Sequence, residues 1–410
     1  MSFPTALFWL LMAAVTAATA YSLIALCGVF RFLQVRRKSA AAASSDFTPP
    51  VSVLKPLYGA DRQLEKNLES FCRQEYPHYE ILFAVREEND AAVPIVRGLQ
   101  KAFPSLAMRL IFAGQPRYLN AKVHALEALA EAAAQEVLVI SDSDVRVAPD
   151  YLRSVVAPLA DPRVGLVTCI SRGVPGRSVW SVLEALSMNL QFLPGVLAAW
   201  VLEGLKFALG PTMVIRKEQL NKLGGFGRLG QYLADDFVLG ELMAKAGYPV
   251  VLANHIPDHL VCNESFRDSL QHRLRWERSS RRSRPAGYVG QIFLHSLPLA
   301  LLAWLFAPGE SPWVSPLVGA CLVARVVLAW ASAGWLLGDA TFRRYWWLLP
   351  IQDFAAFGIW CWAFFGGEVV WRGARFRVLK GGKLEPVNNT TKEHAPPKFD
   401  HPEKQYKEKS

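Results

Sequence analysis

The sequence has few cysteines and no CxxC pair. Its six cysteines are scattered over 410 residues, at positions Cys27, Cys72, Cys169, Cys262, Cys321 and Cys361. This spacing indicates neither a zinc site nor a disulfide framework, and predicts reduced thiols that pack as small hydrophobic groups. Basic residues are also missing in front of the first apolar stretch, whereas a secretory signal peptide begins with them. We therefore expect that stretch to stay attached as a membrane anchor.

Acidic residues are outnumbered, and the formal net charge at pH 7 is +10. Part of the excess lies in "RLRWERSSRRSRP", residues 273–285. A basic run of this kind can bind nucleic acid. Here the run leads directly into an apolar segment, which favours anionic lipid headgroups or a diphosphate as partners. We expect no nucleic-acid partner.

Hydrophobic residues make up 52% of the chain and are concentrated in residues 3–33 and 289–370. The stretch between them, residues 46–288, has the composition of an ordinary globular domain. The first apolar segment exceeds the roughly 20 residues that span a bilayer. The basic residues at 31–38 follow it, so the positive-inside rule places its start outside and the next domain in the cytosol.

Three segments near the C-terminus, 289–307, 313–338 and 345–371, are each long enough to span. Four spans would put the basic residues 372–382 outside, against the positive-inside rule. We expect one segment to be re-entrant or interfacial, and choose 289–307. The expected organisation is a membrane anchor with basic flank at 1–38, a linker at 39–50, a cytosolic domain at 51–288, transmembrane or interfacial helices at 289–372, and a basic flank with a disordered tail at 373–410. A multi-pass protein of a bacterial inner membrane fits this arrangement.

Strands alternate with helices from residue 51. Strands are expected at 51–57, 79–85, 108–113 and 136–140, and helices at 61–73, 92–103 and 120–134. The alternation predicts a parallel sheet covered on both faces, with ligands at the carboxyl ends of its strands. Lys55, the acidic residues at 87–90, and the pair Asp142 and Asp144 all follow such ends. The apolar stretch 178–210 is either a pair of core helices or a pair on the membrane surface.

The sequence "ISDSDVRV" ends a buried strand with Asp142 and Asp144, only one residue apart. Like charges this close repel unless a cation lies between them. A plain turn is the alternative, because Asp and Ser bond their own backbone at strand ends. An EF-hand loop is excluded, since Arg146 and Val147 stand at its fifth and sixth positions. Arg146 also stands where a haloacid-dehalogenase-like phosphatase has Thr or Val.

Four signals occur in a fixed order. An acidic group follows an early strand, Asp-Ser-Asp ends a later one, Asp235 and Asp236 open a later helix, and "HRLRW" (272–276) precedes the membrane segments. This order resembles the inverting GT-A glycosyltransferases, with their D, DxD, (E/D)D and (Q/R)xxRW pattern. The stretches "KPLYGADRQLEKNLESF", "SDSDVRV", "GPTMVIRK", "YLADDF" and "RWERSSRRSRP" resemble the ceramide glucosyltransferase family and the related bacterial hopanoid glycosyltransferases. The resemblance covers about residues 51–290.

The resemblance implies an α/β GT-A (Rossmann-like) cytosolic domain that moves a hexose from a UDP-sugar donor to a lipid hydroxyl with inversion. Asp236 would be the general base, because the attacking hydroxyl must lose its proton. A Mg²⁺ or Mn²⁺ ion would be held by Asp144, with Asp142 shared between metal and ribose. The donor-binding residues would be Lys55, Asp90, Lys122, Asp142, Arg275 and Trp276, and Asp235 and His272 would orient the acceptor.

Some interpretations stay open. His272 departs from the family's Gln or Arg, which puts the outer phosphate contact in doubt. Asp235 and Asp236 could instead cap a helix, and Asp90 could belong to a solvated loop. The acceptor could be a ceramide or a hopanoid. A non-catalytic membrane scaffold that keeps a transferase fold is the alternative from a different class.

Overall fold

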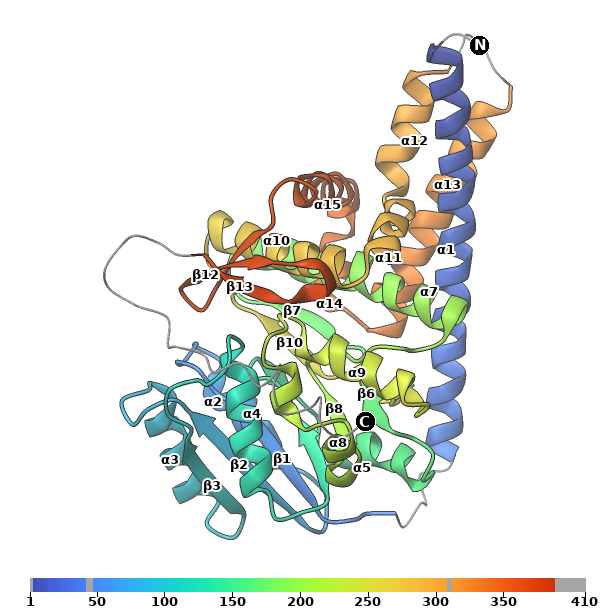
Figure 1. Cartoon of the computed structure of the whole chain (residues 1–410). Helices are drawn as coiled ribbons and strands as arrows, with labels where there is room; N and C mark the ends of the chain where they lie inside the picture. The colour runs from blue at the N-terminus through green and yellow to red at the C-terminus, as the bar shows by residue number, and fades with distance from the viewer. Residues whose placement is uncertain (1–2, 42–46, 308–311, 388–410) are drawn as a thin grey trace.

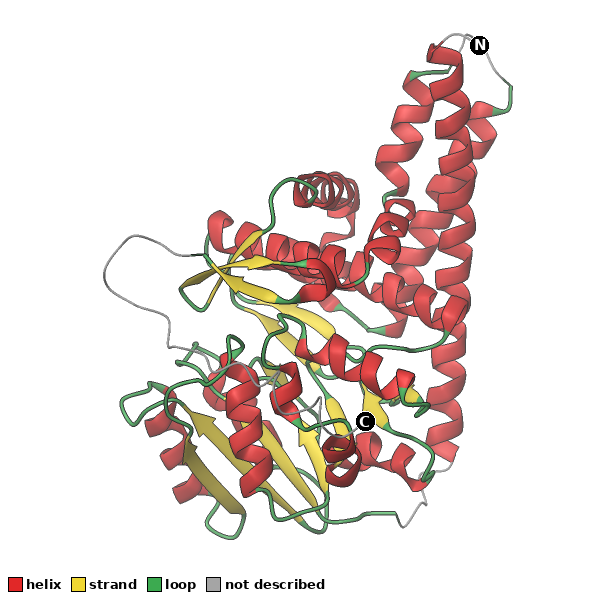
Figure 2. Cartoon of the chain, in the orientation of Figure 1, coloured by secondary structure: helices red, strands yellow, loops and turns green. Residues whose placement is uncertain are grey.

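The computed structural model of the chain describes residues 3–41, 47–307 and 312–387. The tail that the sequence predicts to be disordered, from Asn388, lies outside the described residues, as do positions 42–46 of the expected linker. The described chain forms an α/β body, from which long helices project (Figure 1). All strands lie in the body, and the projecting part is helical (Figure 2).

The elements begin as the sequence predicts, with strands and helices in alternation. The helices are α1 (Phe3–Ala41), α2 (Leu64–Cys72), α3 (Ala92–Ala102), α4 (Ala121–Ala132), α5 (Tyr151–Val156), α6 (Val179–Ser187), α7 (Leu193–Glu203), α8 (Lys217–Lys222), α9 (Asp235–Lys245), α10 (Phe266–Ser283), α11 (Pro285–Gly290), α12 (Ser296–Leu305), α13 (Val314–Ala329), α14 (Ala340–Tyr345) and α15 (Leu349–Ala363). The strands are β1 (Val51–Pro56), β2 (Tyr79–Val85), β3 (Ala107–Phe112), β4 (Val137–Ile140), β5 (Val145–Arg146), β6 (Leu166–Thr168), β7 (Arg172–Pro175), β8 (Met213–Arg216), β9 (Val250–Leu252), β10 (Asp258–Val261), β11 (Glu368–Trp371), β12 (Ala374–Val378) and β13 (Leu384–Pro386).

The central sheet has seven strands in the order β3-β2-β1-β4-β8-β6-β9. Leu54 of β1 lies opposite Leu82 on one side and Ile140 on the other, in parallel register. The four strands from which the sequence predicts a parallel sheet, β1 to β4, are parallel as expected. The later strand β8 lies outside that alternation and runs antiparallel to both β4 and β6. The sheet is therefore mixed, which places the start of β8 beside the carboxyl end of β4.

Alternate residues of the strands pack into two separate cores, because successive side chains point to opposite faces. On one face, Val53 and Val139 pack with α2, α3 and α5. On the other face, Leu54 and Ile140 pack with α4, α8 and α9. Helices thus cover both faces, as the uninterrupted apolar strands predict.

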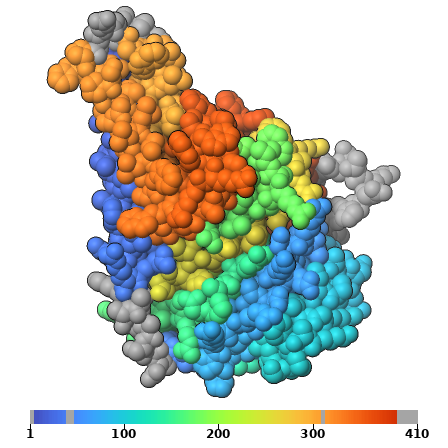
Figure 3. Space-filling model, turned by 180° about the vertical axis from the view of Figure 1, so that it is seen from behind, coloured from blue at the N-terminus to red at the C-terminus, as the bar shows by residue number. Residues whose placement is uncertain are grey.

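The lower end of α1 belongs to the body, where Val29 and Phe32 join the same core as α7. Its upper half packs with α12 and α13 through Phe8, Met12 and Leu299, among others. We call α1, α12 and α13 the stalk. Figure 3 shows from the opposite side that the stalk extends beyond the body.

Three described helices are long and apolar enough to cross a membrane: Thr5–Arg37, Val179–Glu203 and Val314–Leu336. Most of the second one is buried within the protein, which favours the core-helix interpretation of the stretch 178–210. The pair Pro285–Leu294 and Ser296–Leu305 is bent by 66° and fits a broken span or a re-entrant loop. Whether 289–307 is the re-entrant segment stays a prediction.

The expectation that 345–371 is one spanning segment is wrong. The structure divides it into α15, which has only 15 residues, and the strand β11. In Figure 1, α15 is seen almost along its axis, so it lies across the direction of the stalk. A helix of this length is too short to span a bilayer, which needs about 20 residues.

The stretch after residue 372 is also more ordered than the sequence suggests. Strands β11, β12 and β13 form an antiparallel sheet, which we call the C-terminal sheet. It returns to the body, where Val369 and Val378 pack against Leu233. The basic flank expected from 373 is therefore part of the folded protein as far as the described residues reach. A third sheet, β5-β10-β7, lies next to the carboxyl ends of the central strands.

Candidate functional site

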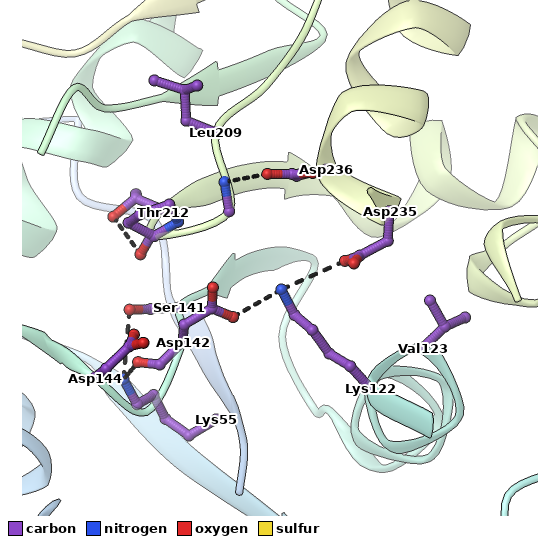
Figure 4. A network of polar contacts seen from close by, with 12 residues as sticks. Lys55, Lys122, Val123, Ser141, Asp142, Asp144, Leu209, Thr212, Asp235 and Asp236 are labelled. Atoms are coloured by element: carbon purple, nitrogen blue, oxygen red, sulfur yellow. Dashed lines mark hydrogen bonds and ion pairs between the residues drawn. The ribbon is translucent and has the colours of Figure 1, made fainter. Parts of the chain in front are cut away.

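The site lies where β1, β2 and β4 end and β8 begins. The parallel register brings the ends of β1 and β4 together, and Ile140 lies opposite Met213 of the antiparallel β8. The turn after β4 therefore faces the loop before β8. Helices α4 and α9 begin at the same edge, so that Lys122, Asp235 and Asp236 meet Asp142 there (Figure 4).

Lys55 lies beneath the turn that holds the two aspartates. Its side chain is fully buried over the ring of Phe71, 3.8 Å from Nζ to the ring centroid. Nζ donates to the backbone oxygen of Asp142 and lies 3.4 Å from Ser141 Oγ. Burial lowers the pKa of Lys55 to about 7, against the pull of Asp142 and Asp144. The structure thus holds Lys55 beneath the turn of the two aspartates, and its contact with a donor stays a prediction.

Lys122 bridges the acids of two elements. Its Nζ lies 2.7 Å from Asp142 Oδ1 and 3.4 Å from Asp235 Oδ2. The side chain is only 12% exposed, so Lys122 is not an ordinary helix-surface lysine. Asn120 starts α4 by accepting from the backbone amides of Lys122 and Val123, which fixes where the lysine leaves the helix. Part of the charge of Asp142 is therefore neutralised by the protein itself.

The two acids at the start of α9 do different things, and neither is a helix cap. The capping position is occupied by Ala234, without a side-chain bond. Asp235 is buried and accepts from Asn120 Nδ2 at 3.3 Å. Asp236 accepts from the backbone amides of Gly210 and Phe237, at 2.6 and 2.7 Å. Burial, with the charge of Asp235, raises the pKa of Asp236 to about 6.

Gly210 separates the carboxylates of Asp236 and Asp142. A Cβ added at this glycine would stand 3.0 Å from Asp236 Oδ2 and 3.1 Å from Asp142 Oδ2. The two oxygens thus flank one small space that any other residue at 210 would fill. A carboxylate with raised pKa and a second carboxylate next to it suit proton removal beside a charged leaving group.

Asp144 is paired with a histidine that the sequence analysis missed. His259 Nε2 of β10 lies 3.3 Å from Asp144 Oδ2. Burial opposes the charge of His259, but Asp144 outweighs it and raises the pKa of the imidazole. The backbone helps to fix the pair, because Leu260 N donates to Asp144 O. The sequence contains no usable signal for this pair, since His259 is a single histidine in a short strand, 115 residues downstream of Asp144.

The donor set at Asp144 fits a hard divalent cation. Asp144 Oδ1 is shielded from solvent and has no hydrogen-bond partner among the described residues. Carboxylate oxygens are the ligands that Mg²⁺ and Mn²⁺ prefer, whereas imidazole suits transition metals better than Mg²⁺. Across residues 3–41, 47–307 and 312–387, no group of three or more His, Cys, Asp or Glu side chains is placed to hold one ion. A metal at Asp144 would therefore need further oxygen ligands from a bound substrate or from water.

Helix α10 carries Arg275 and Trp276 to the same edge. Burial lowers the pKa of Arg275 to about 10, while Asp144 among others attracts its charge. Within the described part of the chain, no hydrogen bond or ion pair engages its guanidinium. Trp276 lies against the ring of His259, with centroids 6.0 Å apart. The Arg275 guanidinium is thus free to bind an anion.

His272 is held by a second residue that the sequence analysis did not assign, Glu184 of α6. The Glu184 carboxylate is buried and accepts from Asn263 Nδ2, from Ser269 Oγ and from His272 Nδ1. His272 also packs against Trp276 in a tilted arrangement, at 4.8 Å between ring centroids. The structure thus places His272 between Glu184 and Trp276, and its role in orienting the acceptor stays a prediction.

Asp90 closes the site on the side of β2. Its carboxylate accepts from Gly59 N at 3.1 Å and from Ala92 N at 2.9 Å. It thereby ties the loop after β1 to the start of α3, which is more than the solvated loop alternative requires. A contact of Asp90 with a nucleoside stays a prediction.

Comparisons with known proteins point to one family. The model of glycosyl transferase family 21 matches residues 10–384. Ceramide glucosyltransferase 1 of Caenorhabditis elegans is 29% identical over 208 residues, which cover 50% of this chain and 44% of that protein. The ceramide glucosyltransferase of Komagataella phaffii is 28% identical over 152 residues, covering 35% and 30%. The chain thus matches less than half the length of these curated relatives.

Among solved structures, mannosyltransferase PcManGT from Pyrobaculum calidifontis in complex with GDP-Man and Mn²⁺ aligns with 86% of this chain and 99% of its own. The TM-score is 0.43 and the sequence identity is 23%. Glucosyl-3-phosphoglycerate synthase from Mycobacterium tuberculosis with Mg²⁺ and uridine-diphosphate aligns with 61% and 81%, at a TM-score of 0.35 and 17% identity.

The family match runs from the stalk helix α1 to β13, and so includes every site element described above. The resemblance that the sequence motifs predict is confirmed, as is the α/β fold with its N-terminal apolar helix. The chain belongs to glycosyl transferase family 21, the ceramide glucosyltransferase family.

Proposed function

We propose that the protein transfers a hexose from a UDP-sugar to the hydroxyl of a membrane lipid, with inversion at the anomeric carbon. Ceramide is the acceptor that the curated relatives support best. The observation that carries the proposal is the convergence of Asp142, Asp144 and Asp236 at one sheet edge, with Lys122 and Arg275 beside them. The reaction needs a carboxylate that accepts the proton of the lipid hydroxyl, and positive charges that offset the charge of the diphosphate. This group of residues supplies both.

Asp236 acts as the general base. The lipid oxygen attacks the anomeric carbon, its proton passes to the Asp236 carboxylate, and the bond to the diphosphate oxygen breaks with its electron pair. A pKa of about 6 keeps Asp236 ionised at neutral pH yet basic enough to accept the proton. Displacement in one step needs a single base, and inverts the carbon.

Lys122 and Arg275 offset the charge that collects on the departing diphosphate. Lys122 keeps Asp142 and Asp235 in place and stays protonated, because these acids outweigh its burial and raise its pKa. Asp144 and His259 are the residues that would hold a Mg²⁺ or Mn²⁺ ion. When bound, such an ion would act as a Lewis acid toward the diphosphate.

The stalk, together with α15, would hold the site at the cytosolic surface of a membrane. Exposed aromatic side chains, including Trp346, Trp347 and Trp362, lie on or next to α15. Aromatic side chains of this kind favour the headgroup region. An acceptor hydroxyl that stays in the bilayer surface could then reach Asp236, while the donor enters from the cytosol.

The test uses the full chain in detergent or nanodiscs, incubated with a panel of UDP-sugars and with either ceramide or a hopanoid polyol. Mass spectrometry identifies the product, and NMR of its anomeric proton reports inversion. We expect a glycolipid whose formation stops with a chelator and returns with Mn²⁺ or Mg²⁺.

Asp144→Asn should remove both the activity and its response to metal, and Asp150→Asn serves as the control because Asp150 is exposed and outside the site. Full turnover in excess chelator would contradict the metal assignment. A folded protein that yields no product from any pair would contradict the proposed reaction.

A further inference from the structure

The turn between β11 and β12 has an unusual residue at its first position. Arg372 and Gly373 form this two-residue turn, with φ of 49° and 80°. Arg372 is the only non-glycine residue with positive φ in the described part of the chain. Turns with positive φ at both positions favour Asn-Gly, since a larger side chain is strained there. The backbone conformation therefore does not favour an arginine at position 372. The contacts of the Arg372 side chain must explain why it is there.

The C-terminal sheet is fixed to both halves of the site. Leu384 N donates to Gln231 O at 2.7 Å, and Leu233 N donates to Gly382 O at 3.1 Å, just before the acids of α9. On the other side, Arg278 and Arg281 of α10 donate to backbone oxygens of residues 364–368. The sheet thus connects the helix of Arg275 to the helix of Asp236, and its turn is held in one place.

The guanidinium of Arg372 lies over the ring of Tyr58, 5.0 Å from its centroid. Tyr58 belongs to the loop that Asp90 holds at the end of β1. Asp142, Asp235 and Asp90 all attract the charge of Arg372, whose burial lowers its pKa. The side chain therefore lies against the loop after β1, at the edge of the central sheet where the site is.

The acids near Arg372 already have other partners. Asp142 and Asp235 are paired with Lys122, and Asp90 accepts from backbone amides. Among the described residues, no hydrogen bond or ion pair is formed by the Arg372 guanidinium. Arg275 of α10 is likewise unpaired, and its burial, together with the charge of Arg372, lowers its pKa. Two unpaired guanidiniums at one site favour the binding of an anion, which offsets their charge.

We propose that Arg372 binds the diphosphate of the nucleotide donor, so that the C-terminal sheet forms one wall of the donor site. This inference rests on the proposed function, in which that donor is a UDP-sugar. A planar guanidinium can take two phosphate oxygens at once, and the Tyr58 ring beneath it limits its orientation.

Arg372→Asn separates binding from folding. Asn-Gly is the preferred pair in such a turn, so the variant should melt at the same temperature as the unchanged protein or higher. Loss of a charge-assisted contact should nevertheless weaken UDP binding by about 10- to 100-fold. Uridine, which lacks phosphate, should bind both proteins equally. Arg372→Lys should recover part of the loss.

Isothermal titration of the full chain in detergent with UDP and with uridine, at fixed salt, measures these effects. Arg375→Asn is the matched control, since it removes one positive charge from an exposed position of the same sheet. Equal UDP affinity in Arg372→Asn and the unchanged protein would overturn the inference and leave the proposed function intact. An equal loss for uridine would also overturn it. Failure of the unchanged protein to bind UDP would overturn both.

Discussion

Individual side chains in this site owe their chemistry to burial and to their neighbours. Asp235 and Asp236 are adjacent in sequence, yet only Asp235 contacts Lys122. Asp236 is left with two backbone amides and a raised pKa. A desolvated carboxylate without a cationic partner is the better proton acceptor of the two.

Asp236→Asn tests this difference. Asn keeps the size of the side chain and an acceptor for the amide of Gly210, but it cannot take up a proton. We expect a folded variant that binds UDP-sugar normally and transfers the sugar at least about a hundredfold more slowly. Asp235→Asn should reduce turnover less. Turnover, donor affinity and melting temperature are measured for both, and a near-normal rate in Asp236→Asn would place the base elsewhere.

Gly210→Ala tests the space between the two carboxylates. The added methyl group would stand 3.0 and 3.1 Å from the oxygens of Asp236 and Asp142, closer than ordinary contact, so both must move. We expect turnover to fall by about tenfold or more, because small displacements of reacting groups are costly. Gly98→Ala on α3, where a Cβ meets nothing within 4 Å, is the control. Unchanged turnover in Gly210→Ala would show that the two acids do not share one reaction centre.

At the scale of the elements, α10 matters most, because it joins the body, the C-terminal sheet and the membrane helices. Its first half is fastened to α6 through Glu184, which accepts three hydrogen bonds while almost fully buried. Its second half is fastened to the segment before β11 by Arg278 and Arg281. The position of Arg275 and Trp276 therefore depends on residues outside the reaction centre.

Glu184→Ala should loosen this helix. Removing the carboxylate leaves three donors without this acceptor, the buried Ser269 and the half-buried Asn263 and His272. We expect a loss of about 2–4 kcal/mol in the free energy of unfolding. The KM for the donor should rise, because Arg275 shifts. Glu184→Gln keeps an acceptor oxygen and should show a smaller loss in both. Thermal unfolding and donor titration measure the two effects. If Glu184→Ala is destabilised but keeps the KM of the unchanged protein, the Glu184 contact does not position Arg275 for the donor.

At the scale of the whole molecule, α1 joins the other two stalk helices, α12 and α13, to the body. Its upper half packs with α12 and α13, and its lower end packs with α7. The helices α1 and α7 lie close together at Gly28, where a Cβ would meet Leu197 at 2.8 Å. The absence of a side chain at Gly28 is what permits this approach.

Gly28→Ala should therefore lower the melting temperature of the detergent-solubilised protein, since overpacking of a helix contact costs about 1–3 kcal/mol. Gly319→Ala in α13 is the matched control. A Cβ there meets nothing within 4 Å, and Ala is the better helix former, so its melting temperature should stay equal or rise. Equal melting temperatures for the two variants would mean that the α1–α7 contact contributes little to the fold.

The sequence by itself determined the elements whose signals are local. Apolar strands at regular distances, helices with one buried face, and long apolar segments follow from residue periodicity and length. They were sufficient to predict β1 to β4, the helices between them, and the acids at the carboxyl edge. The motif order from Asp90 to Trp276 was also sufficient for the family, since it depends only on residue types and their sequence.

Tertiary structure alone decided the rest, because the remaining contacts join residues far apart in the chain. His259 meets Asp144, Glu184 meets His272, and the C-terminal sheet returns to the site past the last membrane segment. The antiparallel direction of β8 depends on how the chain crosses the sheet, and apolar composition alone did not show that 345–371 contains a strand. A single histidine or arginine carries no local period, so its partner is known only when the fold has placed it.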